Sequence, residues 1–134
     1  MKHDFRHYSF TSLFSSDSYT DNILLVENDL SENQLLRAQQ LITYFNENAQ
    51  QIMLKIDELS QNWSFERIAK PERTALMLGI AELKMKLTPR KVVISEWVKL
   101  VDKNSSSDGA KFVNAILDNY CLLYTSDAAD DSRS

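Results

Sequence analysis

Glycine and proline are scarce in this chain of 134 residues, which contains two of each. A β-sheet protein of this size needs more turn residues, so the scarcity favours long helices. The single cysteine, Cys121, excludes an intrachain disulfide and a cysteine metal cluster, and it fits a reducing, cytoplasmic compartment. No apolar run approaches the roughly 18 residues of a membrane-spanning helix. The first residues also lack the apolar core of a signal peptide.

Residues that carry familiar chemistry are also missing. The two glycines, Gly79 and Gly109, form no phosphate-binding loop. His3 and His7 have the i, i+4 spacing of a metal site, but no carboxylate motif accompanies them. Cys121 has no recognisable histidine partner that would make it a nucleophile. The sequence therefore predicts a protein that is not an enzyme and that uses neither a cofactor nor a metal.

The size and charge of the chain fit one soluble domain with a core of its own. The net charge is −4, which argues weakly against a nucleic-acid partner. Residues 63–111, however, hold ten Lys/Arg against six Asp/Glu, a local balance of +4. Affinity for a polyanion follows the charge of one face rather than of the whole protein. A mixed, solvated surface is the alternative that charge alone leaves open.

Apolar residues recur with helical spacing through most of the chain and predict an all-α fold. The residues from Thr74 to Leu87 are apolar on nearly all sides, so we expect a buried central helix there. Pro71 suits its first turn, and Thr88 followed by Pro89 is expected to cap and begin the next helix. The expected helices cover 4–15, 31–60 with a break at 46–48, a short segment that includes Phe65 and Ile68, 71–87, 89–103 and 107–120. The apolar stripes of these helices include Leu36, Leu54 and Val92, which are expected to be buried.

The last expected helix, residues 107–120, has two different faces. A stripe at i, i+3, i+4 and i+7 predicts its buried side, and it consists of Val113, Ile116, Leu117 and Tyr120. Asp108, Lys111 and Phe112 lie outside that stripe. An exposed aromatic ring beside a cation is typical of a surface that stacks bases, whereas a side chain at the edge of the core is the alternative for Phe112. Residues 121–134 are expected to be disordered, since the chain from Thr125 onward is polar and acidic, and to include non-native sequence. This leaves residues 1–120 as the domain.

Three segments together resemble the NusB family of bacterial transcription antitermination factors. The first is NWSFERI at 62–68, followed by Glu72-Arg73 and Ala81-Glu82-Leu83. The second is PRKVVISE at 89–96, similar to the family's PxKVAINE, and the third is KFVNAILD at 111–118, close to its KFVNGVLD. The resemblance implies an all-α, compact helical domain of about six or seven helices in two small subdomains.

The resemblance also implies a function and its partners. Members of the family bind the boxA segment of nascent RNA together with NusE, a ribosomal small-subunit protein. This complex helps RNA polymerase to read through terminators in ribosomal RNA operons, in the cytoplasm, with the antitermination factor as a monomer or a homodimer. Two alternatives remain open: an accessory domain of an RNA methyltransferase, and a helical protein-interaction module that binds no RNA.

The resemblance further assigns residues to these partners. For RNA it implies a basic N-terminal arm, here Lys2, His3 and Arg6, and a second group, Asp108, Lys111 and Phe112. For NusE it implies Phe14 and Glu72. The alternatives for these two are a core aromatic residue and an acid in the first turn of a helix. The arm is thin because Asp4 lies within it.

Overall fold

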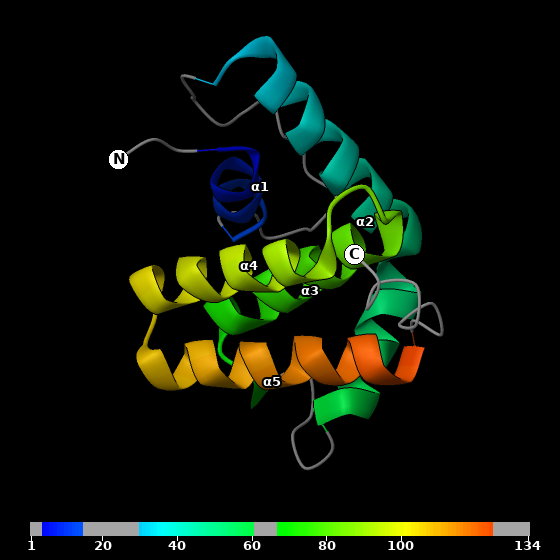
Figure 1. Ribbon diagram of the computed structural model, residues 1–134, viewed down its shortest axis with the longest axis vertical. Coiled ribbons are helices and arrows are strands. Elements are labelled where there is room, and N and C mark those ends of the chain that lie inside the picture. Colours follow the sequence, from blue (N-terminus) through cyan, green and yellow to red (C-terminus); the bar gives the residue numbers. More distant parts are fainter. Residues whose placement is uncertain (1–3, 15–29, 61–66, 125–134) are drawn as a thin grey trace.

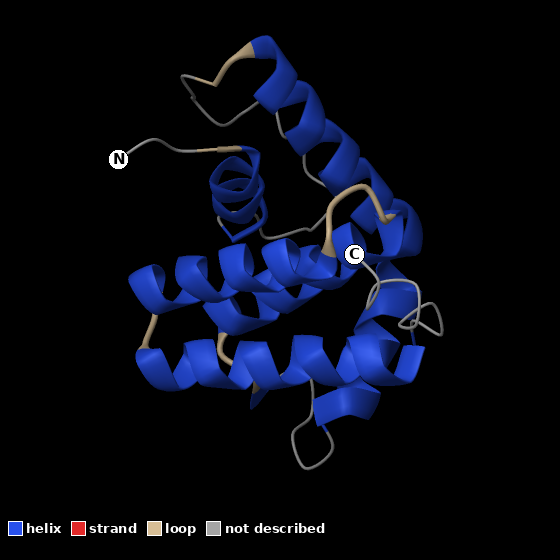
Figure 2. Cartoon of the chain, in the orientation of Figure 1, coloured by secondary structure: helices blue, strands red, loops and turns tan. Residues whose placement is uncertain are grey.

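The computed structural model describes residues 4–14, 30–60 and 67–124, and within these ranges every regular element is a helix (Figures 1 and 2). This agrees with the predicted all-α class. The structure has five helices in the described ranges, so the expected count of six or seven was too high. The expected short helix around Phe65 lies mostly outside the described residues. The helices are α1 (Phe5–Phe14), α2 (Glu32–Ser60), α3 (Lys70–Met85), α4 (Arg90–Asn104) and α5 (Ser107–Tyr124).

Helix α3 is the centre of the fold, as the sequence predicted, and the other four helices all pack against it (Figure 1). Every residue from Thr74 to Leu83 is buried, because this helix has apolar side chains on all its faces. Pro71 lies in its first turn, as expected. The helix ends at Met85, two residues before the expected end, since Lys86 adopts the left-handed conformation with φ 58° and ψ 32°.

Helix α2 is kinked at Asn48, whose φ of −122° and ψ of 16° are not helical. The Asn48 side-chain amide donates a hydrogen bond to the Tyr44 carbonyl oxygen at 2.9 Å, and an inserted side chain of this kind bends a helix. The expected break at 46–48 is therefore a kink within one helix, and this accounts for one helix of the overcount. Leu36 and Leu54, which were expected in the buried stripe, are exposed.

Helix α1 runs antiparallel to α3, as contacts at both of its ends show. Near the start of α1, the Arg6 guanidinium binds the Glu82 carboxylate close to the end of α3. At the end of α1, the ring of Phe14 lies 5.1 Å from the ammonium nitrogen of Lys70, the first residue of α3. The two ends of α1 therefore lie at opposite ends of the central helix.

Helices α4 and α5 pack against α3 and against each other. Pro89 is the N-cap of α4, with a ψ of 138°, so the helix begins one residue later than expected and Thr88 does not cap it. Val92 is exposed rather than buried. Gly79 of α3 lets α4 and α5 come close, because a Cβ there would meet Leu117 at 3.2 Å and Trp97 at 3.5 Å.

The predicted buried stripe of α5 is confirmed, since Val113, Ile116, Leu117 and Tyr120 are all buried. The expected end of this helix at residue 120 was wrong. Helix α5 continues to Tyr124, and Cys121 is buried in the core. The buried stripe of α5 therefore extends to Cys121, one residue beyond its expected end at Tyr120. Within the described ranges, no helix is long and apolar enough to cross a membrane.

Candidate functional site

The starts of α3 and α5 enclose an open, largely apolar hollow of about 340 Å³. The sequence resemblance assigns three of its residues to two separate groups: Asp108 and Phe112 to RNA, and Glu72 to a protein partner. The structure brings these three together in one place. The hollow is lined by Arg67, Ile68, Ala69, Glu72, Asp108, Gly109 and Phe112.

The N-terminus of α5 forms one side of this hollow and is capped by Ser106. Its hydroxyl oxygen accepts a hydrogen bond from the Gly109 backbone N–H at 2.9 Å. Its carbonyl oxygen accepts the first helical hydrogen bond, from Ala110, also at 2.9 Å. Asp108 lies in the first turn, where a negative charge stabilises the helix dipole. The cap therefore fixes the direction in which α5 leaves the hollow.

Glu72 joins α3 to the start of α5. The Ser105 hydroxyl donates a hydrogen bond to its Oε2 at 2.8 Å, and the carboxylate packs directly against Gly109. Only 5% of Glu72 is exposed. Its other oxygen, Oε1, is buried without a hydrogen-bond partner among the residues that the structure describes. This carboxylate therefore holds the two helix starts together and leaves one acceptor unused.

The three residues expected on the outer face of α5 differ in exposure. Asp108 and Lys111 are exposed, whereas Phe112 is half-buried and packs against the core. The Phe112 ring nevertheless lines the hollow. Phe112 therefore packs against the core and also borders the open space, and base stacking on its ring stays a prediction.

Phe14, at the end of α1, also lies near the start of α3. Its ring stacks on Phe10, with centroids 5.7 Å apart and planes within 8°, and it receives the Lys70 ammonium group on one face. Phe14 is half-buried. Lys70 precedes Glu72 by two residues, so the two residues expected to bind a protein partner lie at the same end of α3.

Arg6 is not available on the surface in this structure. Its Nε and Nη2 donate hydrogen bonds to the two Glu82 carboxylate oxygens at 2.9 and 2.7 Å, and only 6% of the residue is exposed. The Trp97 indole N–H donates to the same carboxylate at 2.8 Å. Burial of Arg6 follows from this pairing, because a buried guanidinium needs a bidentate acceptor. Arg6 therefore has a structural role in this structure, and its contact with RNA stays a prediction. Lys2 and His3 lie outside the described residues.

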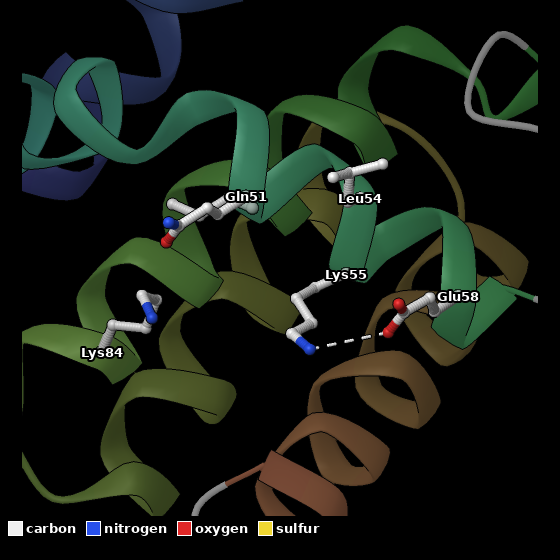
Figure 3. Close-up of a pocket in the computed structure, with 6 residues that line it drawn as sticks. Gln51, Leu54, Lys55, Glu58 and Lys84 are labelled. Carbon is white, nitrogen blue, oxygen red and sulfur yellow. Dashed lines mark ion pairs between the residues drawn. The ribbon is translucent and has the colours of Figure 1, made fainter.

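A second hollow, of about 260 Å³, lies between α2 and the end of α3 (Figure 3). Lys55, Lys84 and Gln51 line it, together with Glu58. The Lys55 ammonium group pairs with the Glu58 carboxylate at 3.6 Å. None of the residues singled out from the sequence lies here. In the described ranges, no group of three or more His, Cys, Asp or Glu side chains is arranged to hold a metal ion.

Sequence reasoning missed three features of the main hollow. Arg67 and Ile68 belong to the NWSFERI segment, but they carried no assigned role. Gly109 carried none either, although it is one of only two glycines in the chain. Its position three residues after a serine, at the start of a helix, was the one available signal of a cap. Gly109 and Glu72 are 37 residues apart in the sequence, so no local pattern predicts the contact between them.

Comparison with known proteins decides the family. The chain matches the NusB family over residues 4–121, a range that contains all five helices except the last three residues of α5. The chain belongs to the NusB family. Among curated NusB relatives, all of them called transcription antitermination protein NusB, the protein of Methylacidiphilum infernorum is 36% identical, over 74% of this chain and 72% of its own length. That of Ligilactobacillus salivarius is 29% identical over 88% and 95%. That of Pediococcus pentosaceus is 39% identical over 46% and 47%.

Solved structures of NusB proteins have the same fold. Thermotoga maritima NusB superposes with a TM-score of 0.85 at 22% identity, over all of both chains. A chain from the crystal structure of antitermination factors NusB and NusE in complex with double-stranded RNA superposes with a TM-score of 0.75 at 25% identity, over 90% of this chain and 95% of that one. A chain in the structure of a plectonemic RNA supercoil gives a TM-score of 0.79 at 26% identity, over 91% and 94%.

Proposed function

We propose that this protein is a transcription antitermination factor that binds boxA RNA together with a NusE-type ribosomal protein. Membership of the NusB family supports this proposal, as does the similarity to a NusB chain that was solved with NusE and RNA. The observation that carries it is the hollow between α3 and α5, which collects Glu72, Asp108 and Phe112 in one place. We further propose that the protein acts by binding alone, without catalysis, in the cytoplasm where transcripts are made.

The chemistry of the hollow suits an unpaired nucleotide. The Phe112 ring offers an apolar face on which a base stacks, a contact worth roughly 1–3 kcal/mol. Arg67 and Lys111 are exposed cations beside it, placed to meet phosphate. The exposed carboxylate of Asp108 repels phosphate, so the hollow accepts a base more readily than it accepts the backbone. These features favour single-stranded RNA with a splayed base.

The protein partner is proposed to bind beside the hollow, over Phe14 and the start of α3. The Phe14 ring and the Lys70 ammonium group are in contact, and both residues are half-buried, so part of each remains accessible to a partner. Glu72 follows Lys70 by two residues on the same helix and is buried. We therefore propose that Glu72 supports the surface from below, by holding α3 against α5, rather than by a direct contact.

A binding titration tests this function. The affinity for single-stranded boxA RNA is measured with and without NusE, against a scrambled RNA of the same length, across a salt series. We expect boxA to bind more tightly than the scrambled RNA, NusE to strengthen the binding, and salt to weaken it. Equal affinity for the two RNAs with no effect of NusE would show that the protein is a helical module of another kind.

A further inference from the structure

The turn between α3 and α4 carries the densest positive charge in the described part of the chain. Residues 84–91 contain four cations and no acid. Lys86 and Lys91 are exposed, while Lys84 and Arg90 are half-buried. Lys84 also lines the second hollow, with Lys55 on the facing helix (Figure 3). None of these residues lines the main hollow between the starts of α3 and α5.

Two of these cations occupy backbone positions that do not favour a lysine. Lys86 adopts a φ of 58° and is the only residue other than glycine with a positive φ in the described ranges. Glycine occupies this left-handed position at a helix end with less strain. Lys91 lies in the first turn of α4, which contains no acid, and a cation there opposes the helix dipole. The local backbone therefore does not by itself favour a lysine at either position.

The turn also lies beside the start of α1. The Arg37 guanidinium of α2 donates a hydrogen bond to the Thr88 hydroxyl at 3.3 Å and lies 4.0 Å above the Phe5 ring. Leu87, 72% exposed, borders the same junction. Asp4 is the acid at this point, and its carboxylate accepts hydrogen bonds from the backbone N–H groups of α1. The basic turn thus adjoins the helix end from which the basic arm leads.

Distance separates this surface from the hollow. The hollow lies at the start of α3 and the turn at its end, and the 16 residues of α3 span about 24 Å at 1.5 Å per residue. An RNA that fills only the hollow does not reach the turn, whereas a longer RNA does. Positive charge at the far end of α3 is therefore placed to act on the RNA that continues past the hollow.

We propose that the turn formed by residues 84–91 is a second RNA-binding surface, which holds the phosphates of single-stranded RNA flanking the segment bound at the hollow. This inference rests on the proposed RNA-binding function. Lys86 and Lys91 contact phosphates, and the planar guanidinium of Arg37 offers a face for one base. The turn supplies the charge that the thin N-terminal arm lacks.

The test compares a short RNA with longer ones in three proteins. The short RNA contains boxA alone, and the longer ones add a uridine tract on the 5′ or the 3′ side. The variant Lys86→Gly/Lys91→Gln removes two charges from the turn. The control Lys55→Gln/Lys99→Gln also removes two positive charges, but from two positions outside the turn. These two lysines pair with Glu58 and Glu96. Lys86→Gly relieves backbone strain, and Lys91→Gln relieves repulsion by the dipole of α4. The melting temperature of the turn variant is therefore expected not to fall.

We expect one extension to tighten binding to the wild type and to the control. The turn variant is expected to lose this gain, with affinity for the longer RNA falling roughly 3- to 30-fold and the salt slope decreasing by about 1.4. The short RNA is expected to bind all three proteins equally. The inference is overturned if neither extension tightens wild-type binding, or if the control loses as much as the turn variant. If the protein binds a scrambled RNA as tightly as the short boxA RNA, the proposed function is refuted instead.

Discussion

The carboxylate of Glu72 occupies the space that a side chain at position 109 would fill. A Cβ on Gly109 would overlap Glu72 Oε2 and lie 2.7 Å from its Cδ. The glycine therefore serves a close approach between two helix starts rather than a special backbone angle, and no positive φ is found at this residue. The contact makes the geometry of the hollow depend on two positions that are far apart in the sequence.

Substitution Gly109→Ala is expected to destabilise the protein by roughly 1–3 kcal/mol, because it displaces the Glu72 carboxylate from its Ser105 partner. The same substitution in a Glu72→Ala background is expected to stabilise by up to about 1 kcal/mol, since alanine has the higher helix propensity. Urea denaturation of the four proteins measures both effects. The same sign in both backgrounds would show that the overlap does not govern position 109.

Substitution Arg6→Ala is expected to cost about 3–5 kcal/mol of unfolding free energy, because it leaves the Glu82 carboxylate buried without its cation. The double variant Arg6→Ala/Glu82→Gln is expected to recover part of this loss, since glutamine carries no charge and still accepts from Trp97. Chemical denaturation gives both values. A cost below about 1 kcal/mol for Arg6→Ala would mean that the ion pair is open to solvent, and it would return Arg6 to the list of RNA-contacting residues.

Substitution Phe112→Ala is expected to weaken RNA binding by roughly 1–3 kcal/mol, the contribution of one stacked base. Helicity is expected to change little, since the ring is only half-buried. Fluorescence titration with boxA RNA and circular dichroism measure the two quantities. The exposed Asn119, on the same helix, provides the control Asn119→Ala. Unfolding of the Phe112 variant would assign this residue to the core alone.

Substitution Asp108→Asn is expected to tighten RNA binding, because it removes a negative charge from the rim of the hollow. It is also expected to lower stability by roughly 0.3–1 kcal/mol, since the acid lies in the first turn of α5. Binding and thermal unfolding should therefore move in opposite directions. Weaker or unchanged binding would place Asp108 outside the RNA site and leave it only its stabilising role in the first turn of α5.

Alkaline pH is expected to destabilise the protein through Tyr120. Burial, followed by the charges of Tyr44 and Cys121, raises the pKa of Tyr120 from 10.0 to about 12. The unfolded chain thus loses this proton first, and the stability that the neutral hydroxyl contributes below pH 10 is lost as the pH rises toward 12. The loss amounts to roughly 1 kcal/mol at pH 11. Denaturation of wild type and Tyr120→Phe at pH 9 and 11 checks this, and an equal loss in both would contradict it.

Local patterns predicted most of the fold. The all-apolar stretch from Thr74 identified the central helix, and the spacing of Val113 and Leu117 identified the buried face of α5. Errors arose where a local signal has two outcomes. The interruption near Asn48 is a kink rather than a break between two helices. Helix α5 also continues past Tyr120 through an apolar run to Tyr124. The exposure of Leu36 and Leu54 could not be predicted from the sequence either, because burial depends on which face of α2 a neighbouring helix covers.

The candidate site was predicted in part. The KFVN segment and the acid before it drew attention to the start of α5, and the structure places Phe112 and Asp108 around one hollow. Arg6 is buried rather than exposed as expected, for a physical reason. A guanidinium near a chain end resembles a surface cation in sequence, and only the approach of Glu82 from α3 makes it a buried ion pair.

The sequence by itself determined the all-helical class, the identity of the central helix and the family, because these follow from apolar spacing and from short runs of residues. The tertiary structure alone decided which of the cations remain on the surface and where they gather. Helix α1 lies antiparallel to α3, so Arg6 pairs with Glu82 while Phe14 lies near Glu72. Pairings between residues tens of positions apart depend on how helices pack, and helix packing leaves no periodic signal along the chain.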